Sequence, residues 1–269
     1  MDRYGLIAGN GKFPFLVLQA AQARNIPMVV AAVKEEASPD INRAAQTVCW
    51  MSIGQLGRLI DFFKQEGVRK AVMAGQVKHV QIFGSAMPDW RMIRMLARLP
   101  RKNTDSLIGA VAEELKREGI ELVDSTAFLE PLLAPAGLIA GPEPSEQKKR
   151  DVAYGRAVAR EVARLDVGQT LIVKDQAVVA VEAMEGTDAV IRRAAELCGG
   201  DFCVIKVAKP NQDMRFDVPV VGAGTIDTMI SFRAALLVVD AYKTLLLDRE
   251  VLRERADRHA VTILGAEPE

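Results

Sequence analysis

The sequence predicts an α/β protein of two domains, the first with a parallel sheet and the second with a mixed sheet. Three observations support this prediction. Short apolar runs alternate with segments of helical period through the first half of the chain. Residues 134–145 are rich in proline and glycine, as linkers are. In the second half, two apolar runs separated by Lys174-Asp175-Gln176 have hairpin spacing, which adds an antiparallel pair to that sheet.

The first domain is predicted over residues 1–133. Its apolar runs have the length and composition of buried strands, and the segments between them gather apolar residues on one side of a helix. Strands joined by helices form a parallel sheet covered on both faces, so we expect a Rossmann-like α/β domain. The predicted strands are Tyr4–Ala8, Met28–Val33, Val48–Met51, Lys70–Ala74 and Ile120–Val123, and the predicted helices are Pro14–Arg24, Gln55–Gln65 and Asp105–Arg117.

A linker is expected over residues 134–145, followed by a second domain over residues 146–269. This domain opens with a long helix that ends near Leu165. Its two hairpin strands are followed by further alternation of helices and strands, which is typical of a second α/β domain. The predicted strands are Gln169–Val173, Ala177–Glu182, Cys203–Ala208, Leu236–Val239 and Val261–Leu264, and the predicted helices are Asp188–Leu197, Thr225–Arg233 and Arg249–His259.

The amino-acid composition disfavours some classes of function. The 269 residues carry 35 basic and 35 acidic side chains, and 5% are aromatic. Nucleic-acid binders usually have a basic excess or stacking aromatics, so that class is disfavoured. Three cysteines form no even framework, which fits a reduced, cytoplasmic setting. Two histidines are too few for a zinc site, so a metal would be magnesium or manganese held by carboxylates and phosphates.

Two glycine-containing loops are expected at the carboxyl edge of the first sheet, where open α/β sheets bind ligands. Gly9-Asn10-Gly11-Lys12 lies between the first strand and the first helix, so its backbone N–H groups would face a phosphate. Pro14 replaces the third glycine of the dinucleotide fingerprint, and a tight turn without a ligand is the alternative. Gly75-Gln76-Val77-Lys78-His79 follows the fourth strand, and its lysine and histidine would meet an anion unless the loop is only solvated.

A third candidate segment is Glu185-Gly186-Thr187-Asp188, which precedes a predicted helix. Thr187 is a good N-cap, and Asp188 complements the helix dipole, so both residues have an explanation without a ligand. That explanation does not extend to Glu182 and Glu185. The segment therefore stays a candidate for substrate binding.

The most informative segment is the polar loop after the Cys203–Ala208 run. Lys206 interrupts that run, where a lysine is costly unless it has a partner. Such a loop suits phosphoryl chemistry, because cations and a metal neutralise charge while a carboxylate holds the metal or orients water. The alternative is a surface loop whose charges pair with one another. The residues concerned are Lys206, Lys209, Pro210, Asn211, Gln212, Asp213, Arg215, Asp217 and Pro219.

The stretch Met87–Lys102 predicts a basic amphipathic helix. Its apolar residues recur at helical spacing, and arginines occupy the remaining positions. Such a helix lies on an anionic bilayer, binds an acyl chain, or packs on the core with its arginines in solvent. No apolar run reaches the ~18 residues of a membrane span, so we do not expect the chain to cross a bilayer.

Several motifs of this chain occur together in one known family. They are Ala8–Pro14, Met73–Lys78, Leu165–Gln169, Val181–Ala183, Glu185–Asp188 and Lys209–Gly222. With them the chain resembles the UDP-2,3-diacylglucosamine pyrophosphatases of the LpxI family over nearly its whole length. The second-half motifs are the specific ones. The chain departs from the family's usual Gly-Asp-Asp at Asn103-Thr104-Asp105, where Thr104 replaces a carboxylate.

The resemblance implies a Mg²⁺-dependent hydrolase of lipid A biosynthesis, with two domains and the lipid nucleotide bound between them. Water would attack the UMP-side phosphorus of UDP-2,3-diacylglucosamine and release UMP and 2,3-diacylglucosamine 1-phosphate (lipid X). Asp217 matches the aspartate of the family's Arg-x-Asp-x-Pro pattern, and it would hold the metal or orient the water. Lys206, Lys209 and Arg215 would stabilise the phosphate charge.

The remaining expectations concern binding and location. The expected substrate-binding residues are Gly9, Asn10, Gly11, Lys12, Gly75, Gln76, Lys78, Glu185, Gly186, Thr187, Asp188, Gln212 and Asp213. The acyl chains need an apolar groove, for which the Met87–Leu99 helix is a candidate wall. An amphiphilic substrate implies transient contact with the inner face of the cytoplasmic membrane, and a homodimer is one expectation for the assembly. Two other classes stay open: a nicotinamide-dependent oxidoreductase and a non-catalytic lipid-nucleotide sensor.

Overall fold

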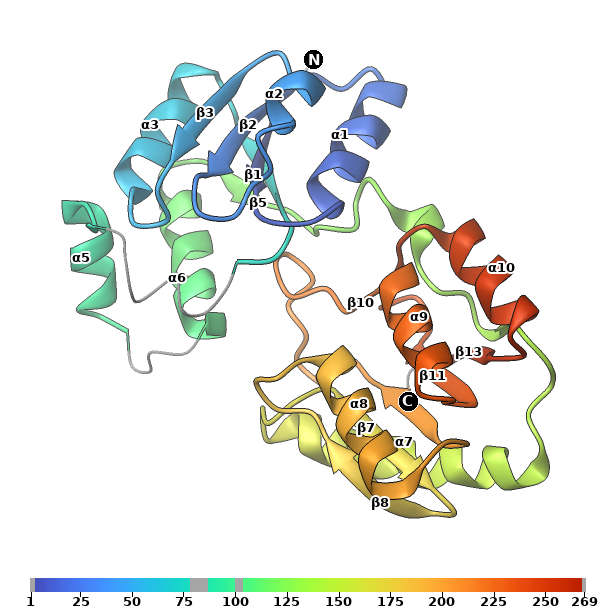
Figure 1. The fold of residues 1–269 in the computed structure, drawn as a ribbon. Helices are drawn as coiled ribbons and strands as arrows, with labels where there is room; N and C mark the ends of the chain where they lie inside the picture. Colours follow the sequence, from blue (N-terminus) through green and yellow to red (C-terminus); the bar gives the residue numbers. More distant parts are fainter. Residues whose placement is uncertain (1–2, 78–86, 100–103, 268–269) are drawn as a thin grey trace. The chain divides into compact units, whose positions relative to one another are not determined.

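The computed structural model describes residues 3–77, 87–99 and 104–267. The chain forms two compact units, both visible in Figure 1. The first unit comprises residues 1–130 together with the short segment 213–217, and the second comprises residues 131–212 and 218–269. A stretch of the second half of the sequence therefore belongs to the first unit.

The first unit contains a five-stranded parallel sheet in the order β3-β2-β1-β4-β5. The strand order reverses direction between β1 and β4, and the carboxyl ends at such a point are where open α/β sheets bind ligands. The strands are β1 Tyr4–Ala8, β2 Met28–Val33, β3 Val48–Met51, β4 Lys70–Ala74 and β5 Glu121–Leu122. The helices are α1 Phe13–Ala23, α2 Ile41–Ala44, α3 Leu56–Gln65, α5 Trp90–Leu96 and α6 Thr104–Arg117, and a 3-10 turn covers Glu130–Leu132.

Helices cover both faces of this sheet, and Figure 1 shows α1 and α3 on opposite sides of it. The register sets Ile7 level with Ala31 on one neighbouring strand and with Met73 on the other. This row belongs to the core that α3, α5 and α6 complete. Side chains alternate between faces along a strand, so the next row on the same face stands at the carboxyl edge and includes Val33 and Met51.

The second unit contains a six-stranded mixed sheet in the order β6-β13-β11-β9-β7-β8. Strands β9, β11 and β13 are parallel, whereas β7 is antiparallel to both of its neighbours and β6 is antiparallel to β13. The strands are β6 Gly137–Ala140, β7 Thr170–Lys174, β8 Ala177–Val181, β9 Cys203–Lys206, β11 Leu236–Asp240 and β13 Thr262–Ala266, and β10 Val220–Val221 pairs separately with β12 Leu245–Leu246.

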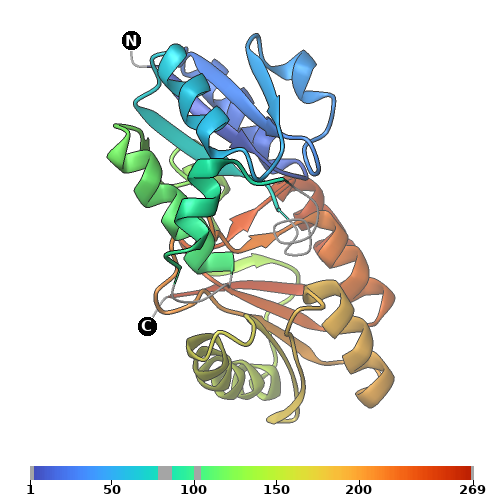
Figure 2. The ribbon, with the colours of Figure 1, turned by 90° about the vertical axis from the view of Figure 1, so that its left-hand side faces the viewer.

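Two separate apolar cores hold the helices of this unit against its sheet. Helix α7 (Glu146–Arg164) packs on one face, and α8 (Thr187–Cys198), α9 (Ala223–Ser231) and α10 (Arg249–Arg258) pack on the other. Figure 2 shows α7 and α8 on opposite sides of the strands. Strands β8, β9 and β11 run in the same direction, so their carboxyl ends lie at one edge.

The predicted fold class, a parallel-sheet α/β domain followed by a mixed-sheet α/β domain, is confirmed. The hairpin turn consists of Asp175 and Gln176, whose φ angles of 50° and 57° are those of a type I′ turn. Part of the stretch predicted as linker differs, because Gly137–Ala140 forms β6 and Ile139 is buried there. The amphipathic helix is shorter than the Met87–Lys102 pattern, since α5 begins after its N-cap Asp89 and ends at Leu96.

Glu118, which follows α6, joins that helix to α3 and α5. Its carboxylate pairs with Lys64 of α3 and with Arg91 of α5. Hydrogen bonds from Lys64 and then from Arg91 lower the pKa of Glu118 from 4.5 to about 2. Stability from this network is therefore fully present above about pH 4.5 and is lost as the pH falls toward 2.

We expect Glu118→Gln to lower the melting temperature at pH 7, because the amide cannot replace the carboxylate in both ion pairs. The difference from the parent protein should shrink as the pH falls from 4.5 toward 2. Thermal unfolding followed by circular dichroism across that range measures this. Glu146→Gln, which removes an exposed pair with Lys149, is the matched control and should have a smaller effect at pH 7. An equal shift for both variants at every pH would contradict the prediction.

Candidate active site

The polar loop that follows β9 starts from the carboxyl edge of the second sheet and is fixed there. The backbone N–H of Ala208 donates to Asp240 Oδ2 at 2.8 Å, at the end of the neighbouring strand β11. Asp240 is 5% exposed, and Arg156 Nη2 of α7 lies 3.3 Å from its other oxygen. A buried carboxylate that is both paired and hydrogen-bonded holds a defined position. The first residues of the loop are therefore anchored to the sheet.

The next part of the loop folds around Gln212. Its side-chain oxygen accepts from the backbone N–H of Lys209 at 2.6 Å and from Gln169 Nε2 at 3.3 Å. Lys209 Nζ lies 2.8 Å from Asp166, which belongs to the turn after α7. Gln212 thus shapes the loop through hydrogen bonds within the protein. The charge of Lys209 is matched by a carboxylate.

Residues Asp213–Asp217 pack on the first unit. Ser125, which is 1% exposed, donates its backbone N–H to Met214 O at 2.9 Å. The Ser125 hydroxyl lies 2.6 Å from Arg215 O and 2.5 Å from Met73 O of strand β4. The ring of Phe216 packs against the core of the first unit. One buried serine and one aromatic ring therefore hold this segment.

Within this segment, Arg215 and Asp213 form a bidentate ion pair. Arg215 Nε and Nη2 lie 2.9 Å and 2.7 Å from the two oxygens of Asp213. The hydrogen bond from Arg215 holds the pKa of Asp213 below its ordinary value, and the same bond raises the pKa of Arg215. Asp217 is partly buried, and its backbone N–H donates to Asp213 O at 2.9 Å. Asp213 thus organises the segment on which Asp217 lies.

A chain of hydrogen bonds connects Lys206 to a buried carboxylate. Lys206 Nζ donates to Thr187 Oγ1 at 2.9 Å, and Thr187 Oγ1 donates to Glu182 Oε1 at 3.0 Å. Thr170 Oγ1 lies 3.2 Å from Thr187 Oγ1. Glu182 and Thr170 are 9% and 1% exposed. This chain gives the lysine a partner and orients its ammonium group at the carboxyl edge of β9.

The rest of the Glu185–Asp188 segment has local roles. Hydrogen bonds from its own backbone N–H and then from Arg193 hold the pKa of Glu185 below its ordinary value. Gly186 is the N-cap of α8, with a φ of 86° that favours glycine. Asp188 accepts from Thr225 Oγ1 at 3.0 Å and so connects the first turns of α8 and α9.

The two glycine loops of the first unit meet, as the parallel strands led us to expect. Asn10 and Gln76 form an antiparallel bridge through N–H···O bonds of 2.8 Å and 3.1 Å. A Cβ atom on Gly9 would lie 2.7 Å from Gln76 O, and one on Gly75 would lie 2.5 Å from Asn10 O. This close approach of two backbones explains both glycines. Gly11 N–H donates to Asn10 Oδ1 at 2.7 Å; Lys12 is the N-cap residue of α1, and Lys78 and His79 lie outside the described residues.

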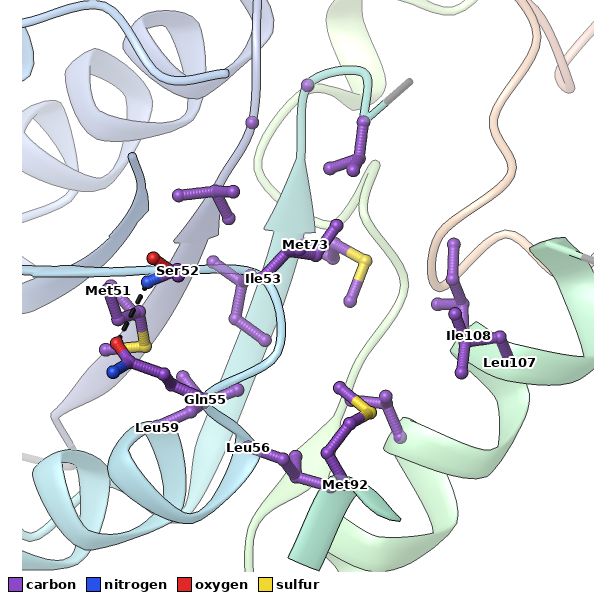
Figure 3. A pocket seen from close by; sticks show the side chains of 17 residues that line it. Met51, Ser52, Ile53, Gln55, Leu56, Leu59, Met73, Met92, Leu107 and Ile108 are labelled. Atoms are coloured by element: carbon purple, nitrogen blue, oxygen red, sulfur yellow. Dashed lines mark hydrogen bonds between the residues drawn. The ribbon is translucent and has the colours of Figure 1, made fainter. Parts of the chain in front are cut away.

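An apolar pocket lies beside these loops, between the sheet and helices α3, α5 and α6 (Figure 3). Met73 of β4 and Met92 of α5 point into it, and Ile108 lines it from α6. Its volume is about 100 Å³, room for about three groups of water or methylene size at ~30 Å³ each. The lining residues are Ile7, Gly9, Ala31, Val33, Met51, Ser52, Ile53, Gln55, Leu56, Leu59, Met73, Gly75, Val77, Met92, Leu107, Ile108 and Val111.

None of the described residues that line the pocket is charged. The pocket favours an apolar ligand over a nicotinamide dinucleotide at the position where doubly wound sheets often bind nucleotides. Helix α5, which was predicted as a wall for the acyl chains, contributes Met92 to the lining of this pocket. Trp90 and Ile93 of the same helix point elsewhere and are 72% and 45% exposed.

No group of three or more His, Cys, Asp or Glu side chains that could hold a metal occurs among the described residues. Mg²⁺ is commonly bound by one or two carboxylates, waters and the phosphates of a substrate. Asp217 is a partly buried carboxylate on an anchored segment. This donor set fits an ion whose coordination is completed by phosphate oxygens.

Three residues of the site escaped the sequence prediction. Ser125 lies in a short turn after β5 and carries no pattern that would mark it. Asp240 ends an apolar strand, and a carboxylate in that position could have been identified from the sequence as a candidate site residue. Glu182 was noted without a role. Cys203 is buried, which raises its pKa to about 12, so it is no nucleophile at neutral pH.

The fold and the site together define a class: a two-unit α/β protein with a polar loop of cations and carboxylates and a separate apolar pocket. Residues 3–132 match the LpxI N-terminal domain and residues 135–264 match the LpxI C-terminal domain. The chain belongs to the LpxI family. It is 31% identical to the UDP-2,3-diacylglucosamine pyrophosphatase LpxI of Caulobacter vibrioides, over 100% of this chain and 99% of that one.

The similarity of this chain to solved structures is weaker. A CobK precorrin-6A reductase aligns with a TM-score of 0.34 and 11% identity, over 100% of this chain and 89% of that one. The biotin carboxylase domain of a thermophilic 2-oxoglutarate carboxylase aligns with a TM-score of 0.28 and 13% identity, over 73% and 33%. At these scores no function transfers.

We expect Ser125→Ala to loosen the Asp213–Asp217 segment, because the carbonyl of Arg215 loses a buried donor. A cost of about 1–3 kcal/mol in stability is typical of such a loss. Hydrogen exchange read by mass spectrometry should show faster exchange in peptides covering residues 213–217. Ser231→Ala removes an exposed hydroxyl on α9 and serves as the control. Unchanged exchange in that segment would mean that the Ser125 hydroxyl is not needed, and that the backbone bond to Met214 and the packing of Phe216 hold the segment.

Proposed function

We propose that this protein hydrolyses the pyrophosphate of UDP-2,3-diacylglucosamine to UMP and 2,3-diacylglucosamine 1-phosphate, in lipid A biosynthesis. The observation that carries the proposal is the 31% identity, over the full chain, to a relative named for that reaction. The site supports it: cations and a carboxylate are placed on an anchored loop, and an apolar pocket is available for part of a lipid. Transient contact with the inner face of the cytoplasmic membrane is part of the proposal, because the substrate is amphiphilic.

In the proposed reaction, the Asp217 carboxylate orients the attacking water or binds Mg²⁺. The oxygen of water forms a bond to the UMP-side phosphorus while the bridging P–O bond breaks, and the proton that the water loses passes to the Asp217 carboxylate or to solvent. The bridging oxygen departs with the lipid phosphate. A bound Mg²⁺ would supply charge neutralisation at the phosphates. The anchoring of residues 213–217 by Ser125 fixes the carboxylate before substrate arrives.

The cations have different local settings, which suggests different roles. Lys206 donates to Thr187, which donates to Glu182, so its ammonium group is oriented at the carboxyl edge of β9 and we assign it to the phosphates. Arg215 uses its Nε–Nη2 edge for Asp213, and a guanidinium has further donors that can reach an oxyanion. Lys209 would have to share its charge between Asp166 and the substrate.

One acyl chain is proposed to enter the apolar pocket of the first unit. The pocket accepts about three methylene-sized groups, each of which contributes about 0.8 kcal/mol when buried. Two methionines point into it, and their flexible thioethers adapt to chains of different length. Gly9 and Gly75 lie at this pocket, which gives the glycine loops a role in substrate binding.

Asp217→Asn should lower kcat by about 100- to 1000-fold, because it removes a charge-stabilising or water-orienting group. The assay is hydrolysis of UDP-2,3-diacylglucosamine with and without Mg²⁺ in oxygen-18 water, with products measured by mass spectrometry. The label should appear in UMP. Asp175→Asn is a matched control in the exposed hairpin turn, where asparagine tolerates the positive φ. Near-normal turnover by Asp217→Asn would refute its role, and label in the lipid phosphate would refute the site of attack.

Ile108→Asp should raise KM for the diacyl substrate about tenfold with kcat little changed, because a charge then lines the apolar pocket. The estimate corresponds to losing about two buried methylene groups. Steady-state kinetics with Val251→Asp on α10 as the control tests this, since Val251 is a partly exposed aliphatic residue outside the pocket. An unchanged KM for Ile108→Asp would remove the acyl chain from the pocket.

A further inference from the structure

Helix α5 carries a second apolar stripe that the core does not use. Its first stripe is buried, since Met92 and Met95 are 7% and 8% exposed and belong to the core of the first unit. Trp90 and Ile93, three residues apart, lie on the other side and are 72% and 45% exposed. Met87, just before the helix, is 93% exposed. A surface helix needs one apolar stripe for packing, so core packing does not explain the second.

The helix is held firmly enough to present that stripe. Asp89 caps it by accepting from the backbone N–H of Met92 at 2.9 Å, and its other oxygen accepts from Gly57 N–H at 2.6 Å. Arg91 pairs with Glu118. The exposed side of the helix is therefore fixed relative to the first unit by contacts on its buried side.

Exposed cations border the stripe. Arg94 and Arg98 are exposed on α5 and in the turn that follows it. The sequence continues with Arg101 and Lys102, and Asp89 is the only acidic residue between Met87 and Lys102. The whole chain has a formal net charge of zero, so the basic character of this stretch is local.

We propose that the exposed stripe of α5, Met87, Trp90 and Ile93 with Arg94 and Arg98, docks on an anionic lipid bilayer. Tryptophan favours the interface between headgroups and acyl chains, and arginine side chains reach the lipid phosphates from beside it. Among the described residues no helix has the length and apolar character of a membrane span, so contact would be made from the surface. The inference extends the proposed function by naming the surface that meets the membrane.

A bilayer fits this stripe better than a protein partner does. The seven residues of α5 extend only about 10 Å, whereas a stable protein interface covers about 800 Å² on each partner. A second copy of this chain would bring the same arginines together, which costs energy by like-charge repulsion. An anionic lipid surface instead complements both the cations and the apolar side chains.

The test is flotation of the full-length protein with vesicles of phosphatidylglycerol and phosphatidylethanolamine, compared with phosphatidylcholine vesicles. We expect binding to the anionic vesicles that weakens with added salt. Arg94→Gln/Arg98→Gln should weaken it about 30-fold, and Trp90→Ser/Ile93→Ser should lower it to the level of phosphatidylcholine. Arg43→Gln and Leu197→Ser, at exposed sites elsewhere, are the matched controls. In a Trp50→Phe background, the remaining Trp90 fluorescence should shift to the blue on binding.

The outcomes separate this inference from the proposed function. Vesicle binding that both paired variants weaken as expected, with hydrolysis of detergent-dispersed substrate retained, supports the docking surface. Absence of vesicle binding by the parent protein, or equal binding by the parent and both paired variants, overturns it whatever the enzyme assay shows. Loss of self-association in Trp90→Ser/Ile93→Ser, measured by sedimentation, would assign the stripe to a second copy and also overturn it. Vesicle binding without hydrolysis supports the surface and refutes only the reaction.

Discussion

The attachment of residues 213–217 to the first unit is the constraint on which the candidate site depends. Ser125 forms hydrogen bonds to the backbone carbonyl oxygens of Met214 and Arg215, and Phe216 packs into the core of the first unit. The chain therefore passes from the second unit to the first and returns within a few residues. Because the anchoring bonds are buried and backbone-directed, they do not depend on which side chains the segment presents. These bonds fix the backbone that carries Asp213, Arg215 and Asp217.

The spacing of apolar residues in the sequence predicted most of the fold, because burial of side chains determines that spacing. Strands β1, β2, β3 and β4 begin and end with the apolar runs, since a strand buried on both faces needs a continuous apolar sequence. Strand β6 was missed because three apolar residues among prolines and glycines carry the pattern of a linker, and only pairing with β13 makes them a strand. Loop composition identified Lys206–Asp217 as polar and charged. It did not indicate that the segment divides between units, because that depends on Ser125, which no local pattern marks.

The glycines show how one sequence feature permits two physical explanations. A glycine-rich turn at a strand end suggests a phosphate, because N–H groups become accessible. Here Gly9 and Gly75 are required because the two loops pair with each other at distances that no Cβ allows. The amides of Asn10 and Gln76 are used in that bridge, and the space beside it is apolar. The close approach of the two backbones therefore explains Gly9 and Gly75 without a bound phosphate.

The carboxyl edges of the two sheets are chemically different. At the edge of the first sheet the described residues that line the pocket carry no charge, and α5 carries apolar side chains on both its buried and its exposed sides. At the edge of the second sheet, β8, β9 and β11 end in Glu182, Lys206 and Asp240, which are joined to hydroxyls, an amide and a guanidinium. The same position in the two α/β units, the carboxyl edge of the strands, is therefore apolar in one and lined by paired polar side chains in the other, because the residues at the strand ends differ.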